Sequence, residues 1–161
     1  MKRAARIAAF LILASLGLAQ PQADRIVVQK AKRQLDLFSH GKLLRSYKVA
    51  LGKNPVGAKT RQGDMRTPEG SYTIDGHYPQ SEYHRALHIS YPNPADRAQA
   101  RKLGVDPGGD IMIHGLPNGQ GYIGKAHRLW DWTQGCIAVT DEEIEEIYRL
   151  VPNGTPVEIR P

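Results

Sequence analysis

Cysteine is almost absent from this sequence: among its 161 residues only Cys136 carries a thiol. A single thiol cannot form a disulfide within the chain, and it excludes a Cys-x-x-Cys redox pair. A structural zinc site is also disfavoured, because no second thiolate is present to build one. We therefore predict no metal site, and Cys136 is either a packed apolar side chain or a reactive thiol.

Long blocks of like charge are also absent. No run of five or more acidic or basic residues occurs, and the basic residues are scattered although the formal net charge is +6. Nucleic-acid-binding domains gather Lys and Arg on one face, so we expect no nucleic-acid partner. Without Lys2, Arg3 and Arg6, nineteen basic residues stand against sixteen acidic ones, which gives +3. This mild basicity would suit an anionic polymer, but it is also common in proteins without such a partner.

Only one apolar run is long, at residues 7–18, and it follows the three basic residues at the N-terminus. Small residues at 17–19 precede Gln20, and this pattern predicts a signal peptide at 1–19 and one domain at 20–161. The run is short for a membrane span of about 20 residues, although an uncleaved anchor is the alternative. The leader has no cysteine, which excludes lipoprotein attachment. We expect export to the periplasm or cell wall, with no stable membrane association after leader cleavage.

An exported protein meets an oxidising environment, in which an unpaired thiol is readily oxidised. A thiol without a function would be a disadvantage there, so its presence favours a reactive role for Cys136. Twenty-two residues upstream, His114 ends the apolar run 111–113, which predicts a buried strand. A free cysteine has a pKa of about 8.5 and is mostly protonated at neutral pH. An imidazole that the fold brings near the thiol can take its proton, so His114 is a candidate base.

The residues around Cys136 also favour a catalytic turn. Gly135 permits a tight turn that brings a backbone N–H close to a substrate carbonyl. The apolar segment 137–139 would anchor the turn to the core, and Thr133 and Gln134 are polar residues on the approach. A buried structural cysteine does not need such a turn. We therefore predict oxyanion or substrate-binding roles for Gly135, Gln134 and Thr133.

His114-Gly115, a spacer, and the segment 133–137 together resemble the signature of the L,D-transpeptidase catalytic domain (YkuD-like) family. The resemblance extends from about residue 25 to the C-terminus. It implies a cysteine enzyme that acts on bacterial peptidoglycan stem peptides without a cofactor. It also implies that Cys136 is the nucleophile and His114 the base, with the backbone carbonyl of Gly115 orienting the imidazole.

Three features depart from that signature. Gln134 replaces a histidine, Ala138 replaces an arginine, and the spacer is longer. With the segment 131–133, these departures resemble the divergent YafK-like branch, which includes members that release a wall-attached lipoprotein from peptidoglycan. The outcome of the reaction is therefore open between acyl transfer and hydrolysis. A non-catalytic peptidoglycan-binding module with an inert thiol is the alternative from another class.

Other histidines offer competing interpretations. His127 lies nine residues before Cys136 and is the rival base, or a residue that contacts substrate or covers the thiol. His84 and His88 have helical i,i+4 spacing, but the segment 85–91 is typical of a strand, where the rings would not converge on a metal. We predict that His77, His84 and His88 are polar residues at a sheet margin, with His84 bordering the cleft beside Tyr83.

The remaining patterns predict a mostly β fold, and the resemblance implies a β-sandwich-like one, with short helices, one of them after the catalytic cysteine. Short alternating segments predict strands at 25–30, 34–38, 43–51, 71–74 and 155–159. Asn93 and Pro94 predict a helix start and Gly104 its end. Thr140 with Glu143 forms a capping box that predicts a second helix. The charged loop 52–70 is expected to line the substrate groove. The glycine-rich spacer 116–132 cannot form one regular element. We expect its two tryptophans to pack, with a place in the groove lining as the alternative for one of them.

Overall fold

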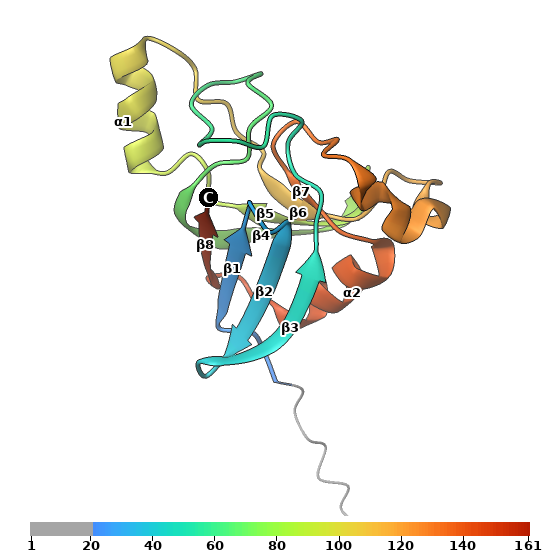
Figure 1. The fold of residues 1–161 in the computed structure, drawn as a ribbon. Helices are drawn as coiled ribbons and strands as arrows, with labels where there is room; N and C mark the ends of the chain where they lie inside the picture. The colour runs from blue at the N-terminus through green and yellow to red at the C-terminus, as the bar shows by residue number, and fades with distance from the viewer. Residues whose placement is uncertain (1–20) are drawn as a thin grey trace, which may run out of the picture.

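The computed structural model describes residues 21–161, and the predicted signal peptide at 1–19 lies outside this range. It contains eight strands, two α-helices and one 3-10 helix (Figure 1). The mostly β prediction is confirmed. The elements in chain order are β1 (Arg25–Gln29), β2 (Gln34–Ser39), β3 (Lys42–Lys48), β4 (Gly70–Ser81), β5 (His84–Ile89), α1 (Pro94–Leu103), β6 (Met112–His114), η1 (Gly121–Leu129), β7 (Ile137–Ala138), α2 (Asp141–Leu150) and β8 (Pro156–Arg160).

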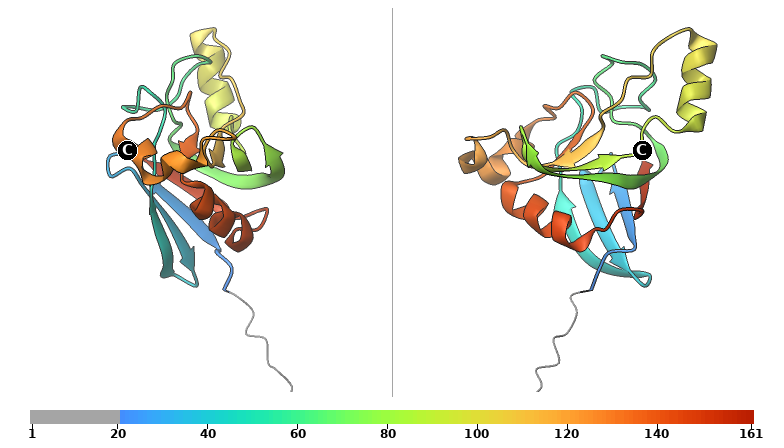
Figure 2. Two further views of the ribbon diagram at one scale, coloured as in Figure 1. Left: turned by 90° about the vertical axis from the view of Figure 1, so that its right-hand side faces the viewer. Right: turned by 180° about the vertical axis from the view of Figure 1, so that it is seen from behind.

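All eight strands belong to one mixed sheet with the order β3-β2-β1-β8-β4-β5-β6-β7. The pairs β1–β8 and β6–β7 are parallel, and the others are antiparallel. The sheet curls, so that β1 to β3 run across the direction of β4 to β6 (Figure 2). The last strand therefore lies in the middle of the sheet, where β8 joins the N-terminal strands to the part that carries β6 and β7.

The hydrophobic core lies within this curl. Alternating residues of neighbouring strands meet there: Ile26 pairs with Leu37 on one side and with Val157 on the other, and all three are buried. Helix α2 contributes Ile144 and Ile147, both fully buried. The helix contacts β5 and β6, and its Glu146 accepts a hydrogen bond from Tyr47 of β3, so it spans the two parts of the sheet (Figure 2).

Both α-helices begin where local sequence signals predict, and α1 also ends where they predict. The Asn93 side chain caps α1, Pro94 is its first residue, and Gly104 ends it with a left-handed φ of 65°. The hydroxyl of Thr140 accepts from the Glu143 N–H, and the Glu143 carboxylate accepts from the Thr140 N–H, which completes the predicted capping box. Among residues 21–161, no helix is long and apolar enough to cross a membrane.

The third strand differs from its prediction. It ends at Lys48, and residues 49–52 leave β2 to pair elsewhere. Ala50 forms an antiparallel bridge with Ala138, and Gly52 forms a parallel bridge with Thr133. The apolar pattern continues through 51 because Val49 and Leu51 remain buried, but their new neighbour is the segment that carries Cys136.

The spacer forms no single regular element, as predicted. Its middle forms the 3-10 helix η1, which is interrupted at Gly124, where φ is 49° and ψ is −135°. Trp130 was expected to pack, and that expectation is wrong: it follows the end of η1 in an extended conformation and is 59% exposed. Trp132 is partly buried and contacts other aromatic rings.

Candidate active site

The pairing of β6 with β7 brings the predicted base and nucleophile to one place. These strands are parallel, with Ile113 opposite Ile137 and His114 opposite Ala138. Cys136 directly precedes β7, so it lies one step from the strand that pairs with His114. Both side chains line the same cavity, whose volume is about 490 Å³.

The walls of this cavity come from four segments that are far apart in sequence. The loop 52–70 and the turn 108–111 supply charged and polar groups, while Tyr83 and Trp132 supply aromatic rings. The predicted role of loop 52–70 as a wall of the groove agrees with this lining. The residues that line the cavity are Lys53, Lys59, Gln62, Gly63, Tyr83, Gly108, Gly109, Asp110, Ile111, Met112, His114, Trp132, Thr133, Gln134 and Cys136.

His114 is buried, and one hydrogen bond defines its tautomer. Its Nδ1 lies 2.7 Å from the Gly115 carbonyl oxygen. A carbonyl only accepts, so Nδ1 carries the proton and Nε2 is left with a lone pair. Burial lowers the pKa of His114 to about 4, against the opposing effect of the Gly115 hydrogen bond. At neutral pH the ring is therefore uncharged, and its Nε2 can accept a proton. A general base requires this form.

Cys136 is held as a thiol in the resting site. Its Sγ lies 3.4 Å from the Asp110 carbonyl oxygen, to which the S–H donates. Burial raises the pKa of Cys136, while a backbone hydrogen bond from Met112 and the positive charge of Lys59 oppose that rise. Since the pKa of His114 is lowered, the resting pair is thiol and neutral imidazole rather than thiolate and imidazolium.

The turn before Cys136 is fixed from both sides. The Thr133 hydroxyl donates to the Cys136 carbonyl over 2.7 Å and accepts from the Gly135 N–H over 3.1 Å. Gly135 has a φ of 135°, and a Cβ there would lie 2.6 Å from the Arg66 carbonyl oxygen. Only glycine fits such a position. Thr133 and Gly135 therefore shape the turn, and the Gly135 N–H already has a partner in this structure.

The other end of the site is fixed by the start of α2. The Asp141 carboxylate accepts from the Leu116 N–H over 2.8 Å, one residue beyond Gly115. A Cβ at Gly115 would lie 2.7 Å from the same carboxylate and 3.1 Å from the Tyr83 carbonyl oxygen. The chain after His114 therefore packs closely against the helix, which holds the Gly115 carbonyl in position.

The structure separates the two candidate bases. His127 is buried, and of the residues described it is not one that lines the cavity. Its Nδ1 accepts a 3.4 Å hydrogen bond from the Trp132 indole. Trp132 also contacts the His114 ring, with centroids 5.7 Å apart. Burial lowers the pKa of His127 to about 4 as well. His127 therefore supports Trp132, and His114 is the imidazole at the thiol cavity.

Sequence patterns did not single out several of the lining residues. The Tyr83 ring, expected only at the border, lies 4.4 Å from the His114 ring between centroids. Lys59 was one of four basic residues on loop 52–70, and no local signal distinguishes the one that turns inward. Gln134, which replaces the usual histidine, is exposed and lines the cavity.

The three histidines of β4 and β5 have protein partners instead of a common centre. His77 contacts Asn153 and Val151, His88 contacts Asp75, and His84 contacts Glu145. Within residues 21–161, no group of three or more potential ligands is placed to hold a metal ion. His84, expected beside Tyr83 at the cleft, faces α2 through Glu145.

Comparison with known proteins places this arrangement in a family. A family model described as the YkuD L,D-transpeptidase catalytic domain matches residues 23–159. YafK of Escherichia coli (strain K12) is 34% identical to this chain over 133 residues, which cover 78% of this chain and 46% of YafK. Its name describes it as an L,D-transpeptidase by inference. YqjB of Bacillus subtilis (strain 168), named in the same way, is 28% identical over 140 residues, 85% of this chain and 71% of YqjB.

Solved structures show the same fold. The helical cell shape determining protein Pgp2 from Campylobacter jejuni matches with a TM-score of 0.66 at 26% identity, over 88% of this chain and 48% of that one. Bd1075 of Bdellovibrio bacteriovorus matches with a TM-score of 0.62 at 25% identity, over 86% and 48%. The chain thus spans less than half the length of YafK, Pgp2 and Bd1075.

Proposed function

This chain belongs to the L,D-transpeptidase catalytic domain family, and we propose that it is an exported cysteine acyltransferase that acts on peptidoglycan stem peptides in the periplasm or cell wall. The observation that carries the proposal is the cavity shared by Cys136 and His114, in which the imidazole has its proton on Nδ1 and its lone pair on Nε2. A thiol nucleophile needs a neighbouring base with a free lone pair that can take its proton, and Nε2 of His114 has one.

Acylation begins when Sγ of Cys136 attacks a peptide carbonyl carbon of the stem, next to a D-centre, and Nε2 of His114 takes the thiol proton. The resulting oxyanion is stabilised by backbone N–H donors of the turn. Because the Gly135 N–H is hydrogen-bonded to Thr133, the Cys136 N–H is the candidate donor within that turn. Collapse of the intermediate breaks the C–N bond, the leaving amine takes the proton from His114, and a thioester remains.

The thioester is resolved by a second nucleophile. An amine from a neighbouring stem gives a new peptide cross-link, and His114 accepts the proton of that amine before returning it to the thiol. Water in the place of the amine gives hydrolysis, which would trim stems or release a wall-attached lipoprotein. The alanine at 138 is buried in β7 and cannot replace the family's usual arginine in chemistry that requires a charge.

Intact-mass spectrometry of the purified protein with isolated stem peptides tests the proposal. Wild type should gain a thioester-linked mass. Cys136→Ala removes one sulfur atom from a side chain that lines the cavity, so the variant should remain folded and unmodified. Cross-linked products would indicate transfer, and shortened stems without cross-links would indicate hydrolysis. Turnover by Cys136→Ala, or the absence of both adduct and turnover in wild type, would refute the thiol mechanism. The second result would favour a peptidoglycan-binding module.

A further inference from the structure

Two buried lysines hold the loop 52–70 that walls the cavity, and they differ in one respect. Lys30, at the end of β1, donates to the Gly57 carbonyl, the Thr67 carbonyl and the Glu69 carboxylate. An ammonium group has three N–H donors, so Lys30 has a partner for each of them. Of the residues described, Lys30 is also absent from the cavity lining. Its role is to anchor the loop.

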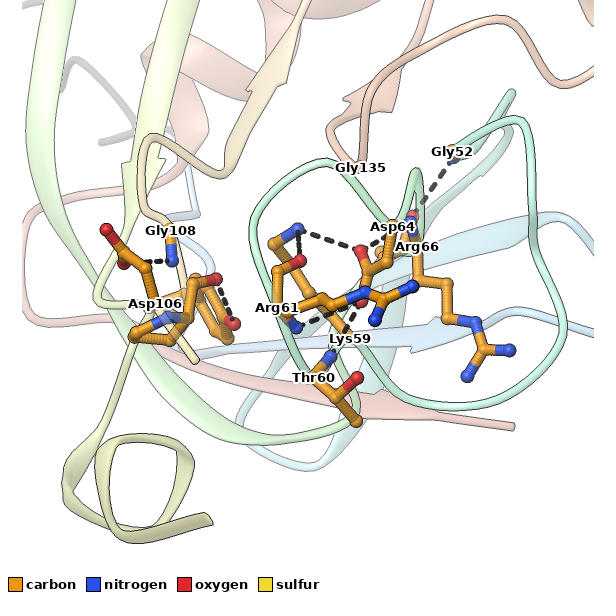
Figure 3. A network of polar contacts seen from close by, with 12 residues as sticks. Gly52, Lys59, Thr60, Arg61, Asp64, Arg66, Asp106, Gly108 and Gly135 are labelled. Atoms are coloured by element: carbon orange, nitrogen blue, oxygen red, sulfur yellow. Dashed lines mark hydrogen bonds and ion pairs between the residues drawn. The ribbon is translucent and has the colours of Figure 1, made fainter. Parts of the chain in front are cut away.

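Lys59 is equally buried, with 4% of its side chain exposed, but it lines the cavity beside Cys136. Its Nζ donates to the Arg61 carbonyl and to the Asp64 carboxylate, both over 2.9 Å (Figure 3). Within residues 21–161 these are its hydrogen-bond acceptors, so one of its three N–H groups is left for a ligand. A buried donor without a partner is costly, and a ligand in the cavity would supply the partner.

The Asp64 carboxylate that pairs with Lys59 has further hydrogen-bond donors. The Asp64 carboxylate also accepts from the backbone N–H groups of Thr60, Arg61 and Arg66 (Figure 3). Burial opposes ionisation of Asp64, but these hydrogen bonds and that of Lys59 together lower its pKa. Asp64 thus has four donors and holds Lys59 in place, while the third N–H of the ammonium has no acceptor among the described residues. The other lysine of the cavity, Lys53, is exposed and screened by water.

We propose that Lys59 is a specificity-determining residue that binds a carboxylate of the acyl donor while Cys136 attacks the neighbouring carbonyl. The inference rests on the proposed function, because it names the group of the stem peptide that the cavity selects. A carboxylate completes the three hydrogen bonds of the ammonium with a charge-assisted one, about twice as strong as a neutral hydrogen bond. A carboxamide in the same place offers no charge, so the selection is for acid over amide.

The carboxylate has two possible sources, the C-terminus of the leaving D-residue and a side chain of the donor. Three stem peptides distinguish them: one with both groups free, one amidated at the C-terminus, and one amidated on the side chain. We expect wild type to acylate with a kcat/KM at least about tenfold higher for the free acid at one of these groups, which is the lower range for a hydrogen bond to a charged group. The amide that is discriminated against identifies the source.

Matched variants separate recognition from loop structure. Lys59→Met should bring the ratio of acid to amide close to one, while Lys59→Arg, which keeps the charge, should retain a preference. Lys30→Met also loosens the loop and should slow both peptides, but it should leave the ratio unchanged. Urea unfolding of each variant checks that it is folded, and the wild-type ratio tests the proposal even if Lys59→Met does not fold.

The inference is overturned if wild type treats acid and amide alike at both groups, if Lys59→Met keeps the preference, or if Lys30→Met loses it equally. Each of these results leaves the thiol mechanism intact, because acylation of Cys136 is still observed. Absence of acylation of wild type by all three peptides would instead overturn the proposed function and the inference with it.

Discussion

Lowering the pH from 7 to 5 should destabilise this protein through His114, and the size of the effect follows from its burial. The folded pKa is about 4, whereas an imidazole in the unfolded chain has a pKa of about 6.5. Between these values the unfolded state binds more protons than the folded state. The free energy of unfolding contributed by this group is therefore present above pH 6.5 and is lost as the pH falls towards 4.

Integration over this interval gives a loss of about 2 kcal/mol for one such group between pH 7 and pH 5. Carboxylates and His127 also contribute in acid, so wild type alone does not isolate the effect. The suitable comparison is His114→Asn, which keeps an N–H donor for the Gly115 carbonyl but does not titrate. Contributions from the other groups then cancel in the difference between the two proteins.

The measurement is the urea-unfolding free energy of wild type and His114→Asn at pH 7 and at pH 5. Wild type should lose about 2 kcal/mol more than the variant over this change. Equal losses would refute the argument, since they would mean that His114 is protonated in the folded protein or is not buried. The same pKa predicts that His114 stays neutral at pH 5. If it is the proposed base, the acylation rate should not fall through a midpoint near 6.5.

Two substitutions test the turn, and one labelling experiment tests its thiol. Gly135→Ala should cost 2 kcal/mol or more, about the size of a strained backbone position, because its Cβ would lie 2.6 Å from the Arg66 carbonyl oxygen at a φ of 135°; unchanged urea stability would contradict this. Thr133→Val should cost about 1–3 kcal/mol and slow acylation, with recovery in Thr133→Ser, because it leaves two backbone groups without their partner. Alkylation of Cys136 by iodoacetamide should continue to accelerate above pH 9, because burial raises the pKa of the thiol; a plateau at neutral pH would indicate a resting thiolate.

The helix ends show what sequence determines locally. Asn93 with Pro94, and Thr140 with Glu143, satisfy backbone donors within three residues of themselves, so their role does not depend on the rest of the fold. The alternating core residues of β1 and β2 are also determined locally, because the antiparallel pairing of these strands follows from the short turn that joins them. These features were predicted correctly for that reason.

Features that depend on distant partners were not predictable in the same way. Residues 49–52 continue the apolar pattern of β3, yet they pair with the segment 133–138, more than 80 positions away along the chain. Lys59 is a different case, because its acceptor Asp64 lies only five positions away. Three backbone N–H groups of the same loop also donate to Asp64, and no turn signal in the sequence specifies that arrangement. His127 was a rival base because sequence distance from Cys136 carries no information about its burial behind Trp132.

The electrostatics of the site also bear on how a single thiol can survive in the exported setting that we propose. Thiolates, not thiols, are oxidised readily. Burial disfavours both the Cys136 thiolate and the His114 imidazolium, so the ion pair is a minor state before substrate binds. In the proposed mechanism the proton moves to Nε2 only as the carbon–sulfur bond forms and the negative charge passes to the substrate oxygen. The reactive state is thereby tied to the presence of substrate, and the same burial that weakens the resting nucleophile protects it.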